Sequence, residues 1–422
     1  MHLEKRYVDV HSAVFDVSTF IENGVLHICK KELIEIAKDF RFESVDFEIA
    51  HPGESCRLSY VGDCVQPMYK PDEGETTFPG MVDEVKRVGM GTSVVLRGIS
   101  VTETLLKPMV IASIIDMIGP ATEESLVLPQ LVHVCLLAKP AKDVQNDAYF
   151  DAVNIASKKV AKYIAQCAKD CVPDEIEKFE IKKDCLEGLP KVAYIFQIFS
   201  HAPLTDTVYY GDGCSSMMPI IVHPNEILDG AMVFRDYYQV CNASPTYFYQ
   251  NHPVLNELLK RHGKDINFVG LIVSNTPAEV INKRRNAMMC SGLAKYHLKA
   301  DCAIITKEGG GHPQIDIGLN CDACEELGIK TVLQLTEFLS AGNPIEELVL
   351  FSTSNADAMV TNGCISVMKF PKVDRVIGLP TMQNQINTEN LDTHGPFEYG
   401  VYPVVRDSIS QIGNTNLSST IY

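Results

Sequence analysis

The chain has 422 residues, which favours two domains over one, and a content of 46% hydrophobic and 22% charged residues is ordinary for a folded globular protein. The net charge of −17 disfavours a nucleic-acid partner, because an acidic surface repels the phosphate backbone. No apolar run reaches the roughly 18–20 residues that span a bilayer, and residues 1–20 lack the apolar core of a signal peptide. We therefore expect a cytoplasmic protein with no membrane partner.

The first part of the chain reads as short strands separated by turns. Apolar, β-branched runs end at glycine, proline or charged positions, which is typical of strands in a mainly β domain. We assign residues 1–143 to such a domain. The expected strands are Val25–Cys29, Val45–Ile49, Val94–Leu96 and Leu126–Leu137, and Pro71–Gly80 is an expected loop.

From residue 144 onward the pattern changes to helices alternating with strands. Apolar residues at helical spacing predict an amphipathic helix over Ala148–Lys169. Alternation of strand and helix predicts a parallel sheet with crossover helices over residues 144–422, so the fold class is α/β, or α+β for the whole chain. Ligands of such sheets bind beyond the carboxyl ends of the strands. The expected strands are Lys191–Phe199, Phe268–Ser274, Cys302–Thr306, Lys330–Leu335 and Ala358–Thr361, and the helices are Pro253–Arg261, Pro277–Ala300 and Asp322–Leu327.

Cys241 lies in a Tyr-rich segment, Asp236–Thr246, between strong elements. A thiol at this position is able to attack the carbonyl of Val240, giving a thioester by an N-to-S shift. Elimination and hydrolysis then leave a pyruvoyl group, an electrophilic ketone that a substrate amine can attack. Cys241 is also one of fourteen cysteines, and on the residues alone a packed thiol is the favoured interpretation.

Two further groups of residues are candidates for chemistry. Cys321 and Cys324 form a C-x-x-C at the start of an expected helix, which suits a redox pair, half of a zinc site or two packed thiols. No second C-x-x-C exists, so we expect no metal. Glu308, His312 and Asp316 surround three glycines after an expected strand and are suited to binding a cationic amine or moving protons, although a tight turn alone explains the glycines.

The glycines of residues 309–311 match neither a G-x-G-x-x-G nor a P-loop, so no nucleotide is expected. The histidines His201, His223 and His252 lie on either side of Cys241 in sequence, each near a proline. We interpret each of them as a loop residue.

Several sequence blocks, in order along nearly the whole chain, resemble the component B subunits of glycine, sarcosine and betaine reductases that mature into an α and a β chain. The most specific block is the eleven-residue run Lys260–Gly270, and the order and spacing of the others strengthen it. The other blocks are Phe78–Met81, Ile115–Met117 with Gly119-Pro120, Leu189–Tyr194, Asn320-Cys321 with Cys324, and Asn416–Ser418 before Tyr422.

The resemblance implies a proprotein that is cut at an internal cysteine, which becomes a pyruvoyl-type group on the downstream chain. By distance from the Lys260 block, this cysteine is Cys241. The resemblance also implies an oligomeric oxidoreductase of amino-acid fermentation in an anaerobe, active only with partner subunits. A selenocysteine-containing component B subunit would attack a small amine substrate, and selenoprotein A would carry the two-carbon unit to component C, which releases acetyl phosphate.

The substrate stays open, because Tyr237, Tyr238 and Gln239 differ from the flanking sequence of the glycine enzyme. Two alternatives remain beside this interpretation. One is a precursor similar to D-proline reductase, which uses the same pyruvoyl chemistry. The other is a non-catalytic redox or scaffold protein in which Cys241 stays a thiol and the Cys321/Cys324 pair carries the function.

Overall fold

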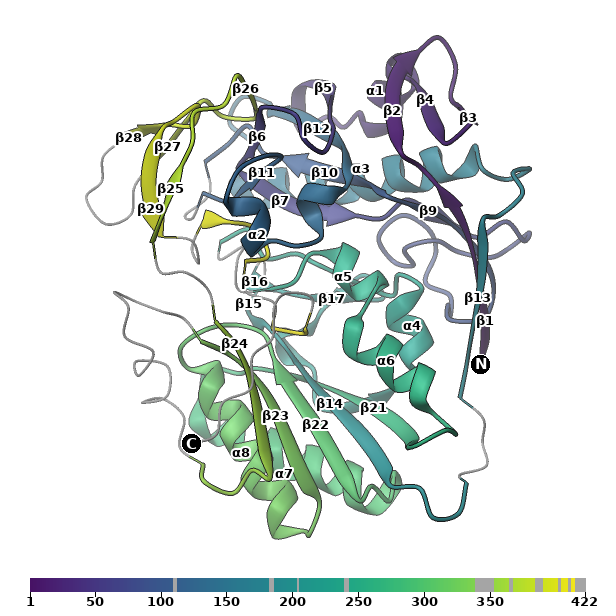
Figure 1. The fold of residues 1–422 in the computed structure, drawn as a ribbon, viewed down its shortest axis with the longest axis vertical. Helices are drawn as coiled ribbons and strands as arrows, with labels where there is room; N and C mark the ends of the chain where they lie inside the picture. The colour runs from purple at the N-terminus through teal and green to yellow at the C-terminus, as the bar shows by residue number, and fades with distance from the viewer. Residues whose placement is uncertain are drawn as a thin grey trace.

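The computed structural model describes residues 1–108, 112–181, 186–202, 205–238, 243–337, 353–363, 367–383, 390–400, 404–408 and 411–413. Figure 1 shows two stacked regions, with small mixed sheets above and one large sheet flanked by helices below. The expected α/β class, α+β for the whole chain, is confirmed. No helix in the described ranges is both long and apolar enough to cross a membrane.

The upper region contains two four-stranded sheets joined by a long helix. One sheet has the order β13-β1-β9-β8 and the other β5-β12-β10-β7, and the helix α3 packs against strands of both. Smaller sheets, β2-β4-β3 and β11-β6-β26, complete this region. The bounds are β1 His2–Asp9, β2 Ser12–Asp16, β3 Phe20–Glu22, β4 Val25–Cys29, α1 Lys30–Ala37, β5 Phe42–Ala50, β6 Cys56–Ser59, β7 Val61–Val65, β8 Met68–Tyr69, β9 Gly91–Arg97, β10 Ile99–Thr104, β11 Ile114–Asp116, α2 Ala121–Glu124, β12 Val132–Pro140, α3 Asn146–Gln166 and β13 Glu175–Glu180.

The expected domain boundary at residue 143 does not coincide with a boundary in the packing. The helix α3 and strand β13 lie after it in sequence, yet α3 covers the upper sheets and β13 pairs antiparallel with β1. The end of the chain also returns to this region, where β26 (Arg375–Ile377) pairs with β6. The reason is that the apolar face of α3 is buried against these strands and not against the large sheet.

Arg57 ties the returning C-terminal segment to the upper region. Its guanidinium donates to both carboxylate oxygens of Asp116, at 2.5 and 2.7 Å, and to the carbonyl of Thr393 at 2.7 Å. Its positive charge lies over the ring of Phe397, 4.7 Å from the centroid. A bidentate pair that is fully buried is expensive to break, because the remaining partner is left charged and unpaired.

The lower region is built on a six-stranded sheet of order β19-β21-β14-β22-β23-β24. All neighbours are parallel except the edge strand β19, which runs antiparallel to β21. This confirms the expected parallel sheet and its strands. The bounds are β14 Lys191–Ile198, β19 Ile220–Val222, α4 Pro224–Leu228, α5 Thr246–Gln250, α6 Pro253–Arg261, β21 Asn267–Asn275, α7 Val280–Gly292, β22 Cys302–Lys307, α8 Pro313–Glu326, β23 Lys330–Glu337 and β24 Ala358–Gly363.

Short strands connect or extend these two regions. They are β15 Ser200–Ala202, β16 Thr205–Asp206, β17 Val208–Tyr209, β18 Asp212–Gly213, β20 Met232–Val233, β25 Val367–Phe370, β27 Thr381–Gln383, β28 Asn390–Asp392 and β29 Phe397–Gly400.

Three expected elements differ from the observed ones. The run Leu126–Leu137 is not one strand, because a turn of 3₁₀ helix (Leu128–Gln130) containing Pro129 precedes β12, and proline has no N–H for a strand ladder. The helix α8 begins nine residues before the predicted Asp322, at Pro313, where proline occupies the favoured first helical position. The expected helix Pro277–Ala300 is shorter, with α7 followed by a π-helical turn, Leu293–His297.

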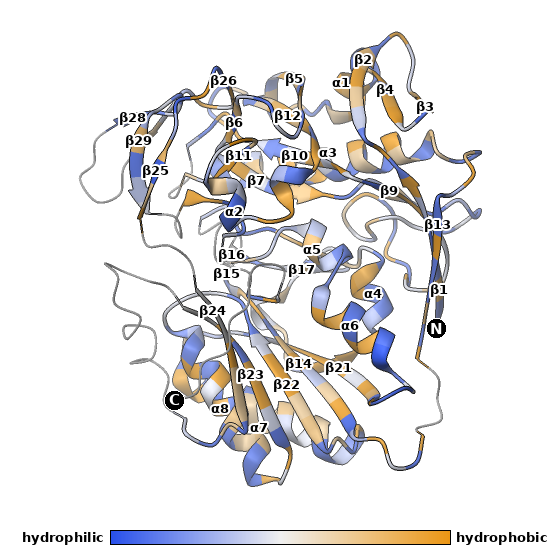
Figure 2. Cartoon of the chain, viewed as in Figure 1, coloured by the Kyte–Doolittle hydropathy of each residue, from blue (hydrophilic) through white to orange (hydrophobic). Residues whose placement is uncertain are grey.

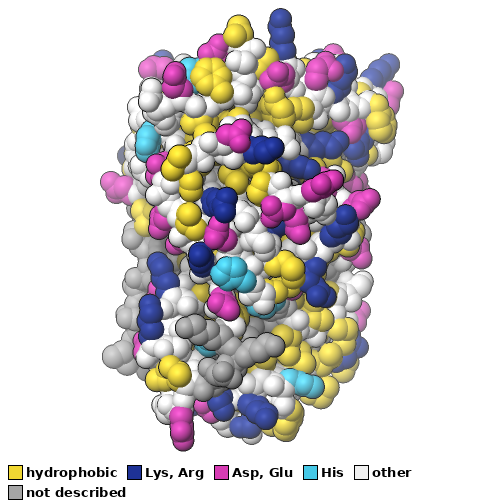
Figure 3. Space-filling view, turned by 90° about the vertical axis from the view of Figure 1, so that its right-hand side faces the viewer, with side chains coloured by type: hydrophobic (Ala, Val, Ile, Leu, Met, Phe, Trp, Pro, Cys, Tyr) yellow, Lys and Arg dark blue, Asp and Glu magenta, His cyan; other side chains and the backbone are white. Residues whose placement is uncertain are grey.

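Residues on both faces of the large sheet are buried, and Figure 2 shows that many residues of β14, β21 and β22 are hydrophobic. Side chains alternate between two cores along β14. Tyr194 and Phe196 belong to the main core, whereas Ala193 and Ile195 belong to a smaller core beneath α7 and α8. On the outer surface shown in Figure 3, acidic and basic side chains are interspersed rather than segregated.

Candidate active site

Polar residues gather where the central strands of the large sheet end. β21, β14 and β22 are neighbours and run in the same direction, so Thr276, Phe199 and Glu308 follow their carboxyl ends side by side. His201 Nδ1 donates to the carbonyl of Thr276 at 2.6 Å, which links the segments that follow β14 and β21. This is the edge at which a parallel α/β sheet is expected to hold its ligand.

Glu308 is a buried carboxylate at this edge, on the side that faces the upper region. It accepts hydrogen bonds from the backbone N–H of Ser244 at 2.8 Å and of Phe199 at 3.3 Å. The hydroxyl of Tyr249 donates to both of its oxygens, at 3.1 and 3.0 Å. Burial raises the pKa of Glu308 to about 7, although these donors oppose the shift. A carboxyl group with this pKa is able to accept and return a proton near neutral pH.

Cys241 and Val240 lie outside the described residues, which end at Tyr238 and resume at Ala243. The structure does define both flanks of this segment, and we call residues 239–242 the central segment. Upstream, the hydroxyl of Tyr237 donates to Glu103 Oε2 at 2.8 Å and accepts from Asn154 at 2.6 Å. The ring of Tyr237 stacks on Phe150, 4.8 Å between centroids.

Downstream of the central segment, three consecutive anchors involve charged side chains. The carbonyl of Ala243 accepts from Arg406 Nη1 at 2.9 Å, and the N–H of Ser244 is held by Glu308 as described above. Thr246 donates its N–H and its hydroxyl to the carboxylate of Asp63, at 2.7 and 2.5 Å. These anchors come from three segments that are far apart in sequence, around Asp63, Glu308 and Arg406.

Asp63 and Glu103 share one buried lysine. Lys158 Nζ, from α3, donates to Asp63 at 2.6 Å and to Glu103 at 3.4 Å. All three side chains are fully buried. Burial raises the pKa of the Asp63 carboxyl, while the positive charge of Lys158 opposes that rise. The flanks of the central segment are thus attached to a buried charged network of the upper region.

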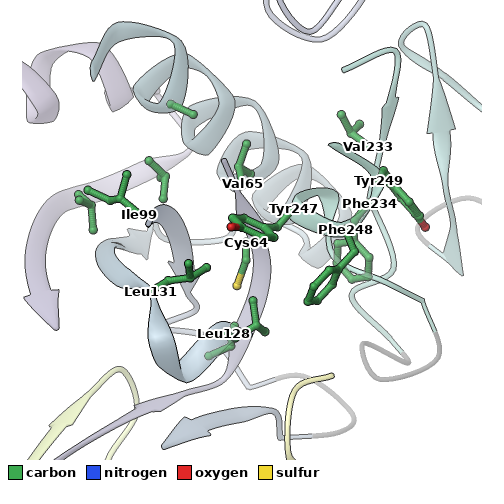
Figure 4. Packing of buried hydrophobic residues seen from close by; sticks show 14 of the residues in the cluster. Cys64, Val65, Ile99, Leu128, Leu131, Val233, Phe234, Tyr247, Phe248 and Tyr249 are labelled. Carbon is green, nitrogen blue, oxygen red and sulfur yellow. The ribbon is translucent and has the colours of Figure 1, made fainter. Parts of the chain in front are cut away.

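Aromatic packing fixes the short helix α5, which follows these anchors. Figure 4 shows Tyr247 beside Cys64 and Val65 of β7, with Phe248 and Tyr249 on the side of Phe234. All three aromatic residues of α5 are buried in the main core. Because the backbone on both sides of the central segment is held by burial and by hydrogen bonds, the segment has fixed ends.

His312 and Asp316 lie together at the same sheet edge and share a partner that the sequence interpretation missed. Lys283 Nζ, in the first turn of α7, donates to His312 Nδ1 at 2.9 Å and to a carboxylate oxygen of Asp316. His201 packs against His312, 4.5 Å between ring centroids. Burial lowers the pKa of His312 to about 4, and the charge of Lys283 adds to that shift. Burial raises the pKa of Asp316 to about 7 although Lys283 opposes the rise.

Of the three histidines interpreted as loop residues, His201 therefore belongs to the site. His223 and His252 act at helix starts instead, where each accepts a hydrogen bond from a backbone N–H of α4 or α6. Among the described residues, no group of three or more His, Cys, Asp or Glu side chains is arranged to hold a metal ion.

Cys321 and Cys324 lie in the interior of α8 and not at its start. Both side chains are buried in the smaller core, and Cys321 Sγ lies 3.2 Å from the hydroxyl of Thr331. Burial raises the pKa of both thiols. The helix N-terminus that lowers a thiol pKa is two turns away, because α8 begins at Pro313. The geometry favours packed thiols, and a redox role stays an untested prediction.

We expect Cys321 and Cys324 to resist alkylation in the folded protein, because neither thiol is exposed or activated. Differential labelling with two isotopic forms of iodoacetamide, before and after unfolding, measures this by peptide mass. The partly exposed Cys171 is the internal control and should react first. Rapid labelling of Cys321 and Cys324 in native buffer would contradict the packed arrangement.

Comparison with known proteins gives one family across most of the chain. A family model described as glycine/sarcosine/betaine reductase component B subunits matches residues 1–395. The glycine reductase complex component B subunits alpha and beta of Acetoanaerobium sticklandii are 33% identical, over 90% of this chain and 89% of that protein. The sarcosine reductase complex component B subunit alpha of Peptoclostridium acidaminophilum is 34% identical, over 90% of each.

The betaine reductase complex component B subunit alpha of Peptoclostridium acidaminophilum is 30% identical, over 90% of this chain and 88% of that protein. The sequence identities to the glycine, sarcosine and betaine reductase proteins are thus similar, so identity alone does not indicate the substrate. No solved structure matches the chain.

Proposed function

The chain belongs to the family of glycine/sarcosine/betaine reductase component B subunits, and from this premise we propose that it matures by cleavage between Val240 and Cys241. As a component B subunit it serves an oxidoreductase complex. The mature protein would consist of residues 1–240 and 241–422, with a pyruvoyl group at the start of the second. Its substrate would be glycine or an N-methylated glycine, and its reaction the reductive cleavage of the C–N bond.

The observation that supports this proposal best is the attachment of both flanks of the central segment. Four buried charged residues from distant parts of the chain hold the residues on either side of it: Asp63, Glu103, Glu308 and Arg406. Burying charge costs free energy unless the charges are paired. An ordinary linker needs no such anchoring, whereas an acyl shift needs a peptide bond held in an oriented turn.

The maturation is a redox-neutral hydrolysis. The Cys241 thiol adds to the Val240 carbonyl and the C–N bond breaks, giving a thioester. Loss of the α-proton expels the thiocarboxylate of Val240 and leaves a dehydroalanine. Two waters enter overall, and one ammonia and one hydrogen sulfide leave, so Val240 ends as a carboxylate and residue 241 as a ketone.

Glu308 is suited to the proton transfers of this sequence. It is bonded to the N–H of Ser244, three residues from Cys241, and its pKa of about 7 lets it exchange protons at neutral pH. Arg406 and Asp63 are positioning residues, which hold the backbone of Ala243 and Thr246. The ketone, once present, supplies an electrophile toward an amine.

The reaction would depend on partner subunits. Reductive C–N cleavage needs a nucleophile and two electrons. We propose that a selenocysteine-containing component B subunit supplies the nucleophile and that a dithiol, oxidised to its disulfide, supplies the electrons. Selenoprotein A would then receive the two-carbon unit and component C would release it as acetyl phosphate. The relatives are each named as components of a reductase complex, which supports a complex here.

The test measures amine release with and without the partners. The purified chain with a dithiol reductant should release no ammonia, methylamine or trimethylamine from glycine, sarcosine or betaine. Adding the two selenoproteins and component C should restore release from one of the three, detected by ion chromatography. Turnover by the chain alone, or no turnover with any of the three in the complete system, would overturn the proposal.

A further inference from the structure

A second buried charged cluster lies at the same sheet edge, on the face covered by α7 and α8. Its members are Lys283, Lys307, His312 and Asp316. Lys283 is 1% exposed and donates to both His312 and Asp316. Lys307 is fully buried, donates to the carbonyl of Gly309, and its charge acts on His312 and on Asp316. Among the described residues, the cluster therefore brings two lysines and one carboxylate together.

Gln197 lies on the same face of the sheet as this cluster, and its side-chain amide has no hydrogen-bond partner among the described residues. It lies opposite Lys307 of β22 and Ser274 of β21 in the sheet register. Strand alternation places its side chain on the same face as Ile195, which belongs to the core beneath α7 and α8. Gln197 is 1% exposed, and neither atom of its side-chain amide has a hydrogen-bond partner within the described ranges. Buried amides are rarely left in this state, so a polar occupant is expected beside Lys307.

The glycine loop leaves this cluster open at one end. A side chain at Gly309 would collide with the ring of Phe199, so the loop lies close against the sheet there. At Gly311, by contrast, a Cβ would meet nothing within 4 Å, and His312 beside it is only partly buried. The first turn of α8 follows directly, and the positive end of its helix dipole favours an anion.

We propose that Lys283, Lys307, His312 and Gln197 bind the carboxylate of the amino-acid substrate. The inference rests on the proposed function, because glycine, sarcosine and betaine share a carboxylate and differ only at nitrogen. Asp316 then serves to hold Lys283 and does not bind the amine, since the two are already paired. A neutral His312 accepts from Lys283 through Nδ1 and leaves its Nε2–H for the ligand.

The position of Phe199 relates this cluster to the central segment. The backbone N–H of Phe199 donates to Glu308, and its ring packs on His201, 4.2 Å between centroids. His201 in turn packs on His312. The buried charged cluster and Glu308 thus lie on the two sides of Phe199. A two-carbon amino acid bound by its carboxylate in this cluster would extend its nitrogen along the same edge of the large sheet.

The test is a titration followed by ligand-observed NMR, with betaine and acetate as carboxylate probes and choline as the matched probe without one. The uncut Cys241→Ala chain is used as the background, so that a failure of maturation and a failure of this site are separate results. Lys283→Met should weaken betaine and acetate binding on the order of ten- to a hundredfold, the loss expected for one charged hydrogen bond. Choline binding should not change.

Arg284→Met is the matched control, because Arg284 is the next residue on α7 and its side chain is exposed. It should bind betaine and acetate like the parent. If Lys283→Met does not fold, His312→Gln gives the same test with a smaller change of charge, and Lys283→Arg should restore part of the binding. Unchanged betaine binding in the variants, or no saturable binding of acetate by the parent, would overturn the proposal.

Discussion

Cys241→Ala should remain a single chain, while the parent protein should run as two fragments under denaturing conditions. Alanine has no thiol to attack Val240 and no β-substituent to eliminate. Intact mass of the parent should show residues 1–240 with an ordinary carboxylate and residues 241–422 without one sulfur and with oxygen in place of one nitrogen. The second fragment should resist Edman degradation, and borohydride should add two hydrogens to it.

The two fragments should stay together in native buffer, because the cut would fall between interlocked strands. In the large sheet, β14 belongs to the first fragment and lies between β21 and β22 of the second. The pair of β6 and β26 joins the fragments again in the upper region. Size exclusion should therefore give one particle before and after maturation, and two only in denaturant.

Cys241→Ser is the graded variant of this experiment, since an alcohol is the weaker nucleophile and should cut slowly. Cys171→Ala is the control, because that thiol is remote in sequence and partly exposed. A fragment that begins at Ser244 would move the site of cleavage without ending the hypothesis. An uncut chain with a thiol at Cys241 and full activity in the assembled complex would end it.

Glu308→Gln should slow maturation by about 10²- to 10⁴-fold, the usual contribution of one positioned acid–base group. The amide keeps an oxygen that can accept from Ser244 and Tyr249 but cannot take up a proton. In the parent, the rate should fall as pH drops below about 7, because the carboxylate of Glu308 becomes protonated there. Pulse-labelled precursor, sampled over time on a denaturing gel, measures both effects.

Glu325→Gln is the matched control for Glu308. Glu325 lies at the far end of α8, where its carboxylate accepts from the N–H and hydroxyl of Thr331. Losing that carboxylate should leave the maturation rate and its pH profile unchanged. If Glu308→Gln matured at the parental rate, Glu308 would have no part in the proton transfers.

Stability provides an independent readout of the Glu308 pKa. The folded pKa, about 7, is raised above the value of 4.5 expected in the unfolded chain. Between these two pH values the folded state binds more protons than the unfolded state, so this group makes stability fall as pH rises. The full effect is about 3 kcal/mol. In the uncut Cys241→Ala background, Glu308→Gln should remove this slope in urea unfolding between pH 5 and 8.

The sequence alone determined the central strands of the large sheet, their parallel arrangement and the family. β-Branched runs such as residues 268–274 are buried on both faces, so their hydrophobic pattern indicates a central strand with little ambiguity. The block Lys260–Gly270 and its ordered companions indicated the family, which the comparisons confirm. The sequence also indicated Glu308 as a candidate site residue, because it follows a predicted strand and precedes three glycines.

Only the tertiary structure decided which side chains meet. Lys283 is one of several lysines and arginines in α7, and nothing in the local pattern separates it from the exposed Arg284 beside it. It pairs with Asp316 because α7 and α8 pack side by side on one face of the sheet. Contacts of this kind depend on crossing helices and strand order, which spacing along the chain does not encode.

The extent of the upper region and the surroundings of the cysteine pair were decided in the same way. The amphipathic pattern of α3 shows that one face is buried, but not against which sheet, and the helix covers the upper region. The sequence predicted a helix that starts at Cys321 and Cys324. In the structure α8 starts at Pro313, so the two thiols lie in its third and fourth turns, where they are buried. Asp63 and Arg406 are 343 positions apart, and both hold the same short segment beside Cys241 only because the chain returns to its first sheets at the end.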